Sequence, residues 1–204
     1  DSLPEIIAAR AQLVATNGSI GTLGDGTDDS LETGIGTLAA LASAGGINIV
    51  NGGDIVVGTV NDVVVQRVND DDSLAQFNAG SLSGLVTTNS GSIVLIDVGD
   101  ITVDDRIAAD GSGNVLVLNQ TGVVSSINFG ADITVNDTIT SGAGHITAIA
   151  GQNFRQNVGG DISTDGDIGV VTRAGDLTQE DGEKATCGHG NIVVVAVSNM
   201  LISA

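Results

Sequence analysis

A short cassette recurs along the chain and constrains its fold more than any other feature. The cassette is a glycine, one polar residue, and then isoleucine, leucine or valine. Its copies are Gly53-Asp54-Ile55, Gly91-Ser92-Ile93, Gly99-Asp100-Ile101, Gly113-Asn114-Val115, Gly144-His145-Ile146, Gly160-Asp161-Ile162, Gly166-Asp167-Ile168, Gly175-Asp176-Leu177 and Gly190-Asn191-Ile192. Such repetition is typical of solenoids, in which stacked units bury a core that no single unit buries alone.

The spacing of the glycines indicates the length of one unit. Two series recur at steps of 30 or 31 residues, namely Gly99, Gly130, Gly160 and Gly190, and Gly113, Gly144 and Gly175. Each unit would then hold at least two strands joined by glycine-rich turns. The strand segments are rich in β-branched residues, and their alternation places Ile133 and Val135 on the same face. The sequence therefore predicts an all-β parallel β-helix with coils of about 30 residues. A β-sandwich is the alternative, because it also uses short strands and frequent turns.

Residues 1–204 read as one solenoid domain with a local departure from the period. The step from Gly53 to Gly91 is 38 residues, which predicts a loop insertion near residues 69–80. Two N-terminal segments are ambiguous. Residues 5–15 read as strand or as a helix that begins at Pro4, and Leu31–Leu41 has helical spacing that its glycines weaken.

Composition narrows the class of protein. The chain has 30 Gly, 3 Phe and neither Trp nor Tyr, which suits a narrow aliphatic core. Its formal net charge of −19 disfavours nucleic acid and anionic membrane surfaces as partners. No segment is long and apolar enough to insert in a membrane, and no signal peptide is visible. Both ends read as cuts through a longer chain.

Three segments, 93–96, 115–118 and 192–197, are apolar at consecutive positions rather than at alternate ones. In a one-layer wall, half of each segment would face solvent, so we expect something to cover it. The cover is either another segment of this chain or another protein chain, including other parts of a parent protein. The residues predicted to make this contact are Val94, Ile96, Leu116, Leu118, Val193, Val195 and Val197.

Metal chemistry has two candidate locations. Acidic turns at Asp28 and Asp29 and at Asp70, Asp71 and Asp72 offer oxygen ligands of the kind that calcium takes, although the calcium-binding nonapeptide repeat and the EF-hand loop are both absent. The expectation is solvated turn acids and no cofactor, with calcium as the alternative. Zinc needs four ligands, whereas the chain holds one cysteine and two histidines, Cys187, His145 and His189. We therefore expect residues 187–189 to form a polar turn rather than a zinc site.

The enzymatic alternative is a polysaccharide lyase or hydrolase. Such a site needs converging carboxylates, and Asp104 with Arg106 or Asp165 with Arg173 could supply an acid beside a base. Carboxylates are plentiful in this chain, however, and sugar sites usually have aromatic platforms, which it lacks. The sequence therefore predicts no catalytic residues.

Taken together, these phrases resemble the repeat regions of giant bacterial secreted surface proteins, with filamentous-haemagglutinin-like right-handed parallel β-helices of the planctomycete type. Gly-Asp-Ile-Thr-Val and the glycine turns before His145 and Asn191 carry the resemblance, most clearly over Gly91–Ala204. The period departs from that of the haemagglutinin repeat, which is shorter. The resemblance implies a secreted or cell-surface stalk with a structural or adhesive role, and it admits cell-surface glycans as partners.

Overall fold

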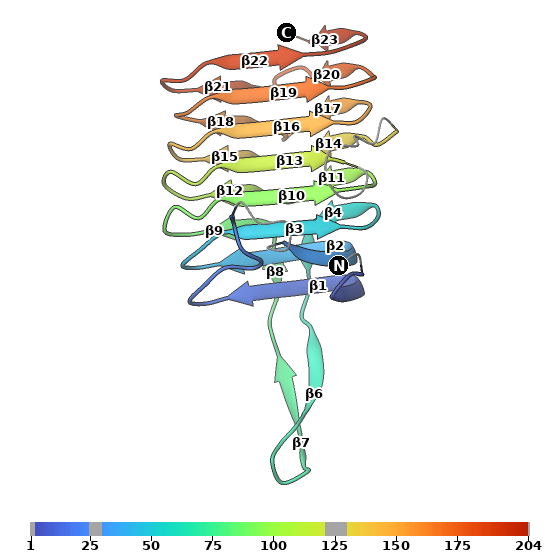
Figure 1. Ribbon diagram of the computed structural model, residues 1–204, viewed down its shortest axis with the longest axis vertical. Helices are drawn as coiled ribbons and strands as arrows, with labels where there is room; N and C mark the ends of the chain where they lie inside the picture. Colours follow the sequence, from blue (N-terminus) through green and yellow to red (C-terminus); the bar gives the residue numbers. More distant parts are fainter. Residues whose placement is uncertain (1–2, 25–29, 121–129, 204) are drawn as a thin grey trace.

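The computed structural model describes residues 3–24, 30–120 and 130–203 and is built from β-strands (Figure 1). No helix occurs in these residues, so none could cross a membrane. Nineteen of the 23 strands belong to one large sheet, in which every pairing is parallel. The all-β expectation is confirmed, and the long parallel sheet is consistent with a solenoid.

Most strands fall into three ladders, each a series of parallel strands that lie one above the next. Ladder 1 contains β3 (Ile47–Asn51), β10 (Ile93–Asp97), β13 (Val115–Asn119), β16 (Ile146–Ala150), β19 (Ile168–Thr172) and β22 (Ile192–Val195). Ladder 2 contains β4 (Ile55–Val57), β11 (Ile101–Val103), β14 (Ile133–Val135), β17 (Phe154–Gln156), β20 (Leu177–Gln179) and β23 (Met200–Ile202). Ladder 3 contains β9 (Leu85–Thr87), β12 (Ile107–Ala109), β15 (Ile139–Ser141), β18 (Ile162–Thr164) and β21 (Ala185–Cys187). One strand from each ladder makes one rung.

Two long strands start the stack. β1 (Ile6–Ala15) pairs along its length with β2 (Leu31–Ala42), and β2 in turn pairs with the first strand of all three ladders, β3, β4 and β9. Both segments that could have been helical are therefore strands. Helical spacing of leucines in Leu31–Leu41 is overridden by tertiary pairing on both edges of the strand.

The spacing of paired strands corrects the period. Ile93 pairs with Val115 and Ile146 pairs with Ile168, each 22 residues further on, and Ile168 pairs with Ile192 after 24. The interval of 31 residues from Val115 to Ile146 includes 121–129, which lie outside the described residues. The expected coil of about 30 residues was wrong because its glycine series mixed ladders. Gly130 precedes β14 of ladder 2, Gly160 precedes β18 of ladder 3, and Gly190 precedes β22 of ladder 1.

Alternation along each short strand builds the core. In β14, Ile133 and Val135 are both 0% exposed, while Thr134 between them is half-buried, as the sequence predicted. The same pattern recurs in all three ladders, so the interior is a stack of isoleucine, leucine, valine and alanine. The largest fully buried side chain is Phe154. This narrow interior explains why the chain can dispense with most aromatic residues.

A hairpin interrupts the first rung between ladders 2 and 3. Its base is the antiparallel pair β5 (Thr59–Val60) and β8 (Leu82–Ser83), and its arm is the antiparallel pair β6 (Val64–Val68) and β7 (Leu74–Asn78). Gln12 Nε2 donates to the carbonyls of Val60 and Gly80, both at 2.7 Å, and so ties the base to β1. The arm extends past β1, away from the ladders (Figure 1). The insertion predicted near 69–80 falls within this hairpin.

Candidate interaction surface

The outward positions of ladder 1 carry an apolar stripe. Because side chains alternate across a strand, the residues between the buried ones point to solvent. These outward aliphatic residues are Val50, Val94, Ile96, Leu116, Leu118, Ile149, Val171, Val193 and Val195. Six of the seven residues predicted to make an interface lie in this stripe. The seventh, Val197, follows the end of β22.

The strand register aligns the stripe along the long axis of the stack. Ile96 is the register partner of both Val50 and Leu118, and the same column continues through Ile149, Val171 and Val195. Neighbouring rungs cover the flanks of these side chains and leave most of them half-buried. Exposure rises at the last rung, where Val193 is 57%, Val195 44% and Val197 63% exposed.

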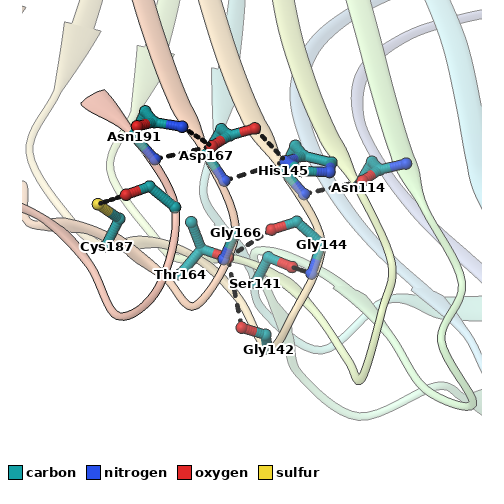
Figure 2. A network of polar contacts seen from close by, with 11 residues as sticks. Asn114, Ser141, Gly142, Gly144, His145, Thr164, Gly166, Asp167, Cys187 and Asn191 are labelled. Carbon is teal, nitrogen blue, oxygen red and sulfur yellow. Dashed lines mark hydrogen bonds and ion pairs between the residues drawn. The ribbon is translucent and has the colours of Figure 1, made fainter. Parts of the chain in front are cut away.

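A column of polar residues borders the stripe where the strands of ladder 1 begin (Figure 2). Each side chain accepts a hydrogen bond from the backbone N–H of the residue one rung further on. Asn114 Oδ1 accepts from His145 N at 2.8 Å, His145 Nδ1 from Asp167 N at 3.0 Å, and Asp167 Oδ1 from Asn191 N at 2.7 Å. This first polar column explains why the cassettes that precede ladder 1, such as Gly144-His145-Ile146, have a polar residue after the glycine.

Asp167 is the acidic centre of this border. Its Oδ2 lies 3.2 Å from His145 Nδ1, and its side chain is 51% exposed. The backbone N–H of Asn191, helped by the Asn191 side chain and by His145, holds the pKa of Asp167 below its usual range. Asp167 therefore presents a negative charge to solvent directly beside the apolar stripe.

A shallow hollow interrupts the stripe next to this acid. Its volume is about 440 Å³, and its lining includes Thr147, Gly169 and Val193 together with His145, Asp167 and Asn191. Thr147 and Gly169 are register partners between Leu116 and Val193 in one outward column. The hollow exists because these two residues are small where their neighbours in the column are large. One wall is apolar and the opposite wall is polar and acidic.

The chain matches no protein-family model, no curated protein and no solved structure.

A second polar column accounts for many of the acids of the chain. It borders ladder 2 and consists of Asp54, Asp100, Asp132, Asn153, Asp176 and Asn199, in which each of the first five side chains accepts the backbone N–H of the next member at 2.8–3.0 Å. Arg155 Nη2 also approaches Asp132 Oδ2 at 3.7 Å. The backbone N–H of Asn199 is the main cause that lowers the pKa of Asp176. These carboxylates therefore accept hydrogen bonds that join neighbouring rungs. From the sequence alone, we had expected the acids only to keep the surface soluble.

Cys187 occupies a structural position. Its Sγ donates to Gly190 O at 3.1 Å, at the end of ladder 3 where Thr164 Oγ1 donates to Gly144 O (Figure 2). In the same ladder Ser141 Oγ donates to Gly113 O. Cys187 thus replaces a hydroxyl residue in this column. Nowhere among the described residues do three or more His, Cys, Asp or Glu side chains gather in a way that could hold a metal ion.

Of the acidic turns considered as calcium ligands, the structure describes the one at Asp70–Asp72. Asp28 and Asp29 lie outside the described residues. Asp70, Asp71 and Asp72 form the tip of the β6–β7 hairpin, where Asp71 Oδ1 accepts from both the N–H and the hydroxyl of Ser73 at 3.0 and 2.5 Å. Those hydrogen bonds, chiefly that of the Ser73 hydroxyl, lower the pKa of Asp71. The Asp71 carboxylate is therefore engaged in closing the turn.

The residue pairs considered for catalysis do not form acid–base pairs. Asp104 accepts from Asn136 Nδ2 at 2.7 Å, and the ion pairs of the described residues join His145 to Asp167 and Arg155 to Asp132, without Arg106 or Arg173. One carboxyl has a pKa that burial raises to about 7, that of Asp97. Asp97 is fully buried inside ladder 1, where no substrate reaches it.

Sequence reasoning missed the apolar side chains of the hairpin arm. Val64, Val65, Val68, Leu74 and Phe77 are each between 47% and 65% exposed. The signal was present in two short segments with apolar residues, Val64–Val68 and Leu74–Asn78, on either side of the Asp70–Asp72 turn, an arrangement typical of a β-hairpin. The stripe residues Ile149 and Val171 were also missed, because they become visible only with the 22-residue register.

Proposed function

We propose that this chain is a rigid structural segment of a large secreted or cell-surface bacterial protein, a right-handed β-solenoid that holds an apolar stripe in a fixed position for contact with other protein chains. The observation that carries this proposal is the unbroken parallel register of the ladders. Successive rungs are tied together by backbone pairing in three ladders, two of which continue to the last rung, and by the two polar columns. Such a stack resists bending and shear along its whole length.

The winding follows from the order of the strands. The chain visits ladder 1, ladder 2 and ladder 3 in turn and then returns to ladder 1 one rung further on, as in β10, β11, β12 and β13. Connections between parallel strands of one sheet are right-handed in about 98% of cases. A right-handed winding also agrees with the resemblance to the haemagglutinin-like repeats.

The secreted, surface-exposed location rests on the same resemblance and on the charge. A formal charge of −19 keeps a long β-stack soluble and limits association between its exposed strand edges. Attachment, whether to other chains or to cell-surface glycans, would use side chains that point outward from the ladders. The apolar stripe is the largest aligned set of such side chains described above.

Pulling on single molecules by their two ends tests the structural role. A rung of 22 residues, extended at about 3.5 Å per residue, releases roughly 80 Å of chain. A β-solenoid that bears load is expected to give successive rupture events with this increment. One rupture that releases the whole chain would count against it.

Immunogold labelling of intact, unpermeabilised cells tests the location, and labelling only after permeabilisation would contradict the surface assignment.

The enzymatic alternative is not favoured by any observation. The insertion near 69–80 belongs to an exposed hairpin whose arm, β6 and β7, also carries Arg67 and pairs with no strand of the stack. Neither Arg67 nor Arg106 takes part in an ion pair of the described residues. A polysaccharide depolymerisation assay with the purified chain is expected to show no product above background.

A further inference from the structure

We propose that one face of the β6–β7 hairpin docks on the apolar stripe of a second copy of this chain, with Phe77 seated in the hollow over Gly169 and Arg67 beside Asp167. This inference rests on the proposed function and names the partner of the stripe. It joins two surfaces that are each without a partner in the described chain, the hairpin arm and the hollow.

The hairpin arm lacks the packing that a two-stranded ribbon needs. β6 and β7 pair with each other and with no other described strand. An isolated two-stranded hairpin is marginally stable in water unless a face packs on something. Phe77 is 52% exposed at the second strand, although it is one of only three Phe residues in the sequence. The arm therefore shows the composition of a contact surface that is free in the monomer.

The antiparallel register sorts the arm into two faces. Val65 is paired with Phe77 and Arg67 with Ala75, so these four side chains share one face. The opposite face carries Val64, Val68 and Leu74 among the polar residues Gln66, Gln76 and Asn78. Val68 and Leu74 are themselves register partners, so both faces carry an apolar pair. The first face is the better match for the hollow, because it alone carries an aromatic ring, Phe77, and a cation, Arg67.

The hollow on ladder 1 complements that face. Its apolar side, at Gly169 and Val193, offers room for an aromatic ring because Gly169 has no side chain to fill it. Its polar side presents the carboxylate of Asp167, which lies two residues before Gly169 and directly precedes β19. Diagonal neighbours on a hairpin lie about 7–8 Å apart, which matches Phe77 and Arg67 to these two features. The result is an apolar anchor flanked by one pair of opposite charges.

The partner is a second copy because the hairpin does not project toward the stripe of its own chain. It emerges between ladders 2 and 3, whereas the stripe lies on ladder 1, and it projects past β1 away from the stack (Figure 1). The dimensions also agree. Five residues of β6 span about 17 Å, and the six strands of ladder 1 span about 24 Å at 4.8 Å per strand.

Charge sets the conditions for association. Each copy has a formal charge of −19, so two copies repel each other at low ionic strength. Salt at about 0.5 M reduces the screening length to a few ångströms and removes most of that repulsion. The contact between Phe77 and the hollow is apolar and survives these conditions. Association is therefore expected to strengthen from low to moderate salt.

Sedimentation equilibrium of the full 204-residue chain in about 0.5 M salt tests the contact from both sides. Phe77→Ser on the hairpin and Gly169→Val in the hollow are each expected to weaken self-association at least tenfold. A Cβ at Gly169 would meet only Thr147 Oγ1 at 3.9 Å, and valine is favoured in strands, so the second variant is expected to keep its fold. Leu74→Ser, on the opposite hairpin face, is the matched control and is expected to associate like the unmodified chain.

Disulfide trapping then identifies the contact. Phe77→Cys and Thr147→Cys, each made with Cys187→Thr and mixed, are expected to give a covalent heterodimer, whereas Asn78→Cys with Thr147→Cys gives none. A chain that stays monomeric at every concentration, or dimers that persist unchanged in both Phe77→Ser and Gly169→Val, would overturn the proposal. The two proposals fail separately. If the chain stays monomeric but unfolds rung by rung in single-molecule pulling, the docking proposal is wrong and the structural role stands. If the chain associates as expected but unfolds in one rupture, the structural role is wrong and the docking proposal stands.

Discussion

Asn51 Nδ2 donates a hydrogen bond to Asp97 Oδ1 at 3.0 Å in the interior of ladder 1, where the two residues are register partners. Asp97 is 0% exposed, and its Oδ2 also accepts from Gly99 N at 3.0 Å. Burial raises the pKa of Asp97 to about 7, even though both hydrogen bonds favour the carboxylate. Asp54 nearby adds to the increase. The core therefore contains one group whose charge changes near neutral pH.

Asp97 is expected to make the stability of the fold depend on pH. Its pKa in the folded chain, about 7, lies above the ordinary value of 3.8, so the folded state holds the proton more tightly. This contribution to stability is fully present below pH 3.8 and is lost as pH rises toward 7. A difference of this size corresponds to at most about 4 kcal/mol. Urea unfolding at a series of pH values between these limits measures the decline.

Asp97→Asn is the variant that isolates this effect. Asn119 occupies the corresponding position of the next strand and is accommodated there, with Nδ2 donating to Gly99 O at 2.7 Å. The variant is expected to be more stable than the unmodified chain above pH 7 and to lose the decline between pH 3.8 and 7. An unchanged pH profile in Asp97→Asn would show that other groups cause the decline.

Two glycines, Gly144 before β16 and Gly169 within β19, are expected to respond in opposite ways to the addition of one methyl group. A Cβ on Gly144 would collide with the carbonyl oxygen of Gly113 in the preceding rung, whereas a Cβ on Gly169 would make only an ordinary contact with Thr147 Oγ1, at 3.9 Å. Gly144→Ala is expected to cost roughly 1–3 kcal/mol, because the backbones must move apart. Gly169→Ala is expected to add about 0.5–1 kcal/mol, since alanine loses less entropy in a strand. Thermal unfolding of both variants, with equal stability as the contradicting outcome, checks this contrast.

The position of Cys187 predicts which replacement the chain tolerates. A hydroxyl is a stronger donor than a thiol, and Thr164 already fills the equivalent place one rung earlier. Cys187→Thr is expected to raise the free energy of unfolding by about 0.5–1 kcal/mol. Cys187→Val has the same shape as threonine but no donor, and is expected to give no such gain. If valine stabilised the fold as much as threonine, packing rather than the hydrogen bond to Gly190 would be responsible.

Strands and their inward faces could be predicted from the sequence because they depend on local alternation. Ile133 and Val135 are an example, as their burial follows from the period of two. The rung length could not be predicted in the same way. Glycine turns precede strands of all three ladders, so the distance from Gly160 to Gly190 joins ladder 3 to ladder 1. Only the pairing of strands far apart in the sequence, such as Ile146 with Ile168, separates the ladders.

The candidate surface was predictable where apolar residues are consecutive and hidden where they alternate. Val94 and Ile96 belong to an uninterrupted apolar segment, whereas Ile149 follows Thr147 and Ala148 and looks like ordinary core alternation. The hollow could not be predicted at all, because it depends on Thr147 and Gly169 being register partners. Polar columns were hidden for the same reason, since each of their hydrogen bonds connects residues 21–32 positions apart within the regular rungs.

The second polar column predicts a difference between amide and methyl replacements of its acids. Asp132 Oδ1 accepts from both the N–H and the side-chain amide of Asn153, each at 2.9 Å. Asp132→Ala removes this acceptor and is expected to cost about 1–2 kcal/mol. Asp132→Asn keeps an oxygen at the same place, as Asn153 does for Asp176 N, and is expected to stay within about 0.5 kcal/mol of the unmodified chain. Asp70→Ala, at the hairpin tip, removes the same charge without touching the column and serves as the control in urea unfolding. Equal losses in Asp132→Ala and Asp132→Asn would mean that the charge, and not the hydrogen-bonded column, stabilises the stack.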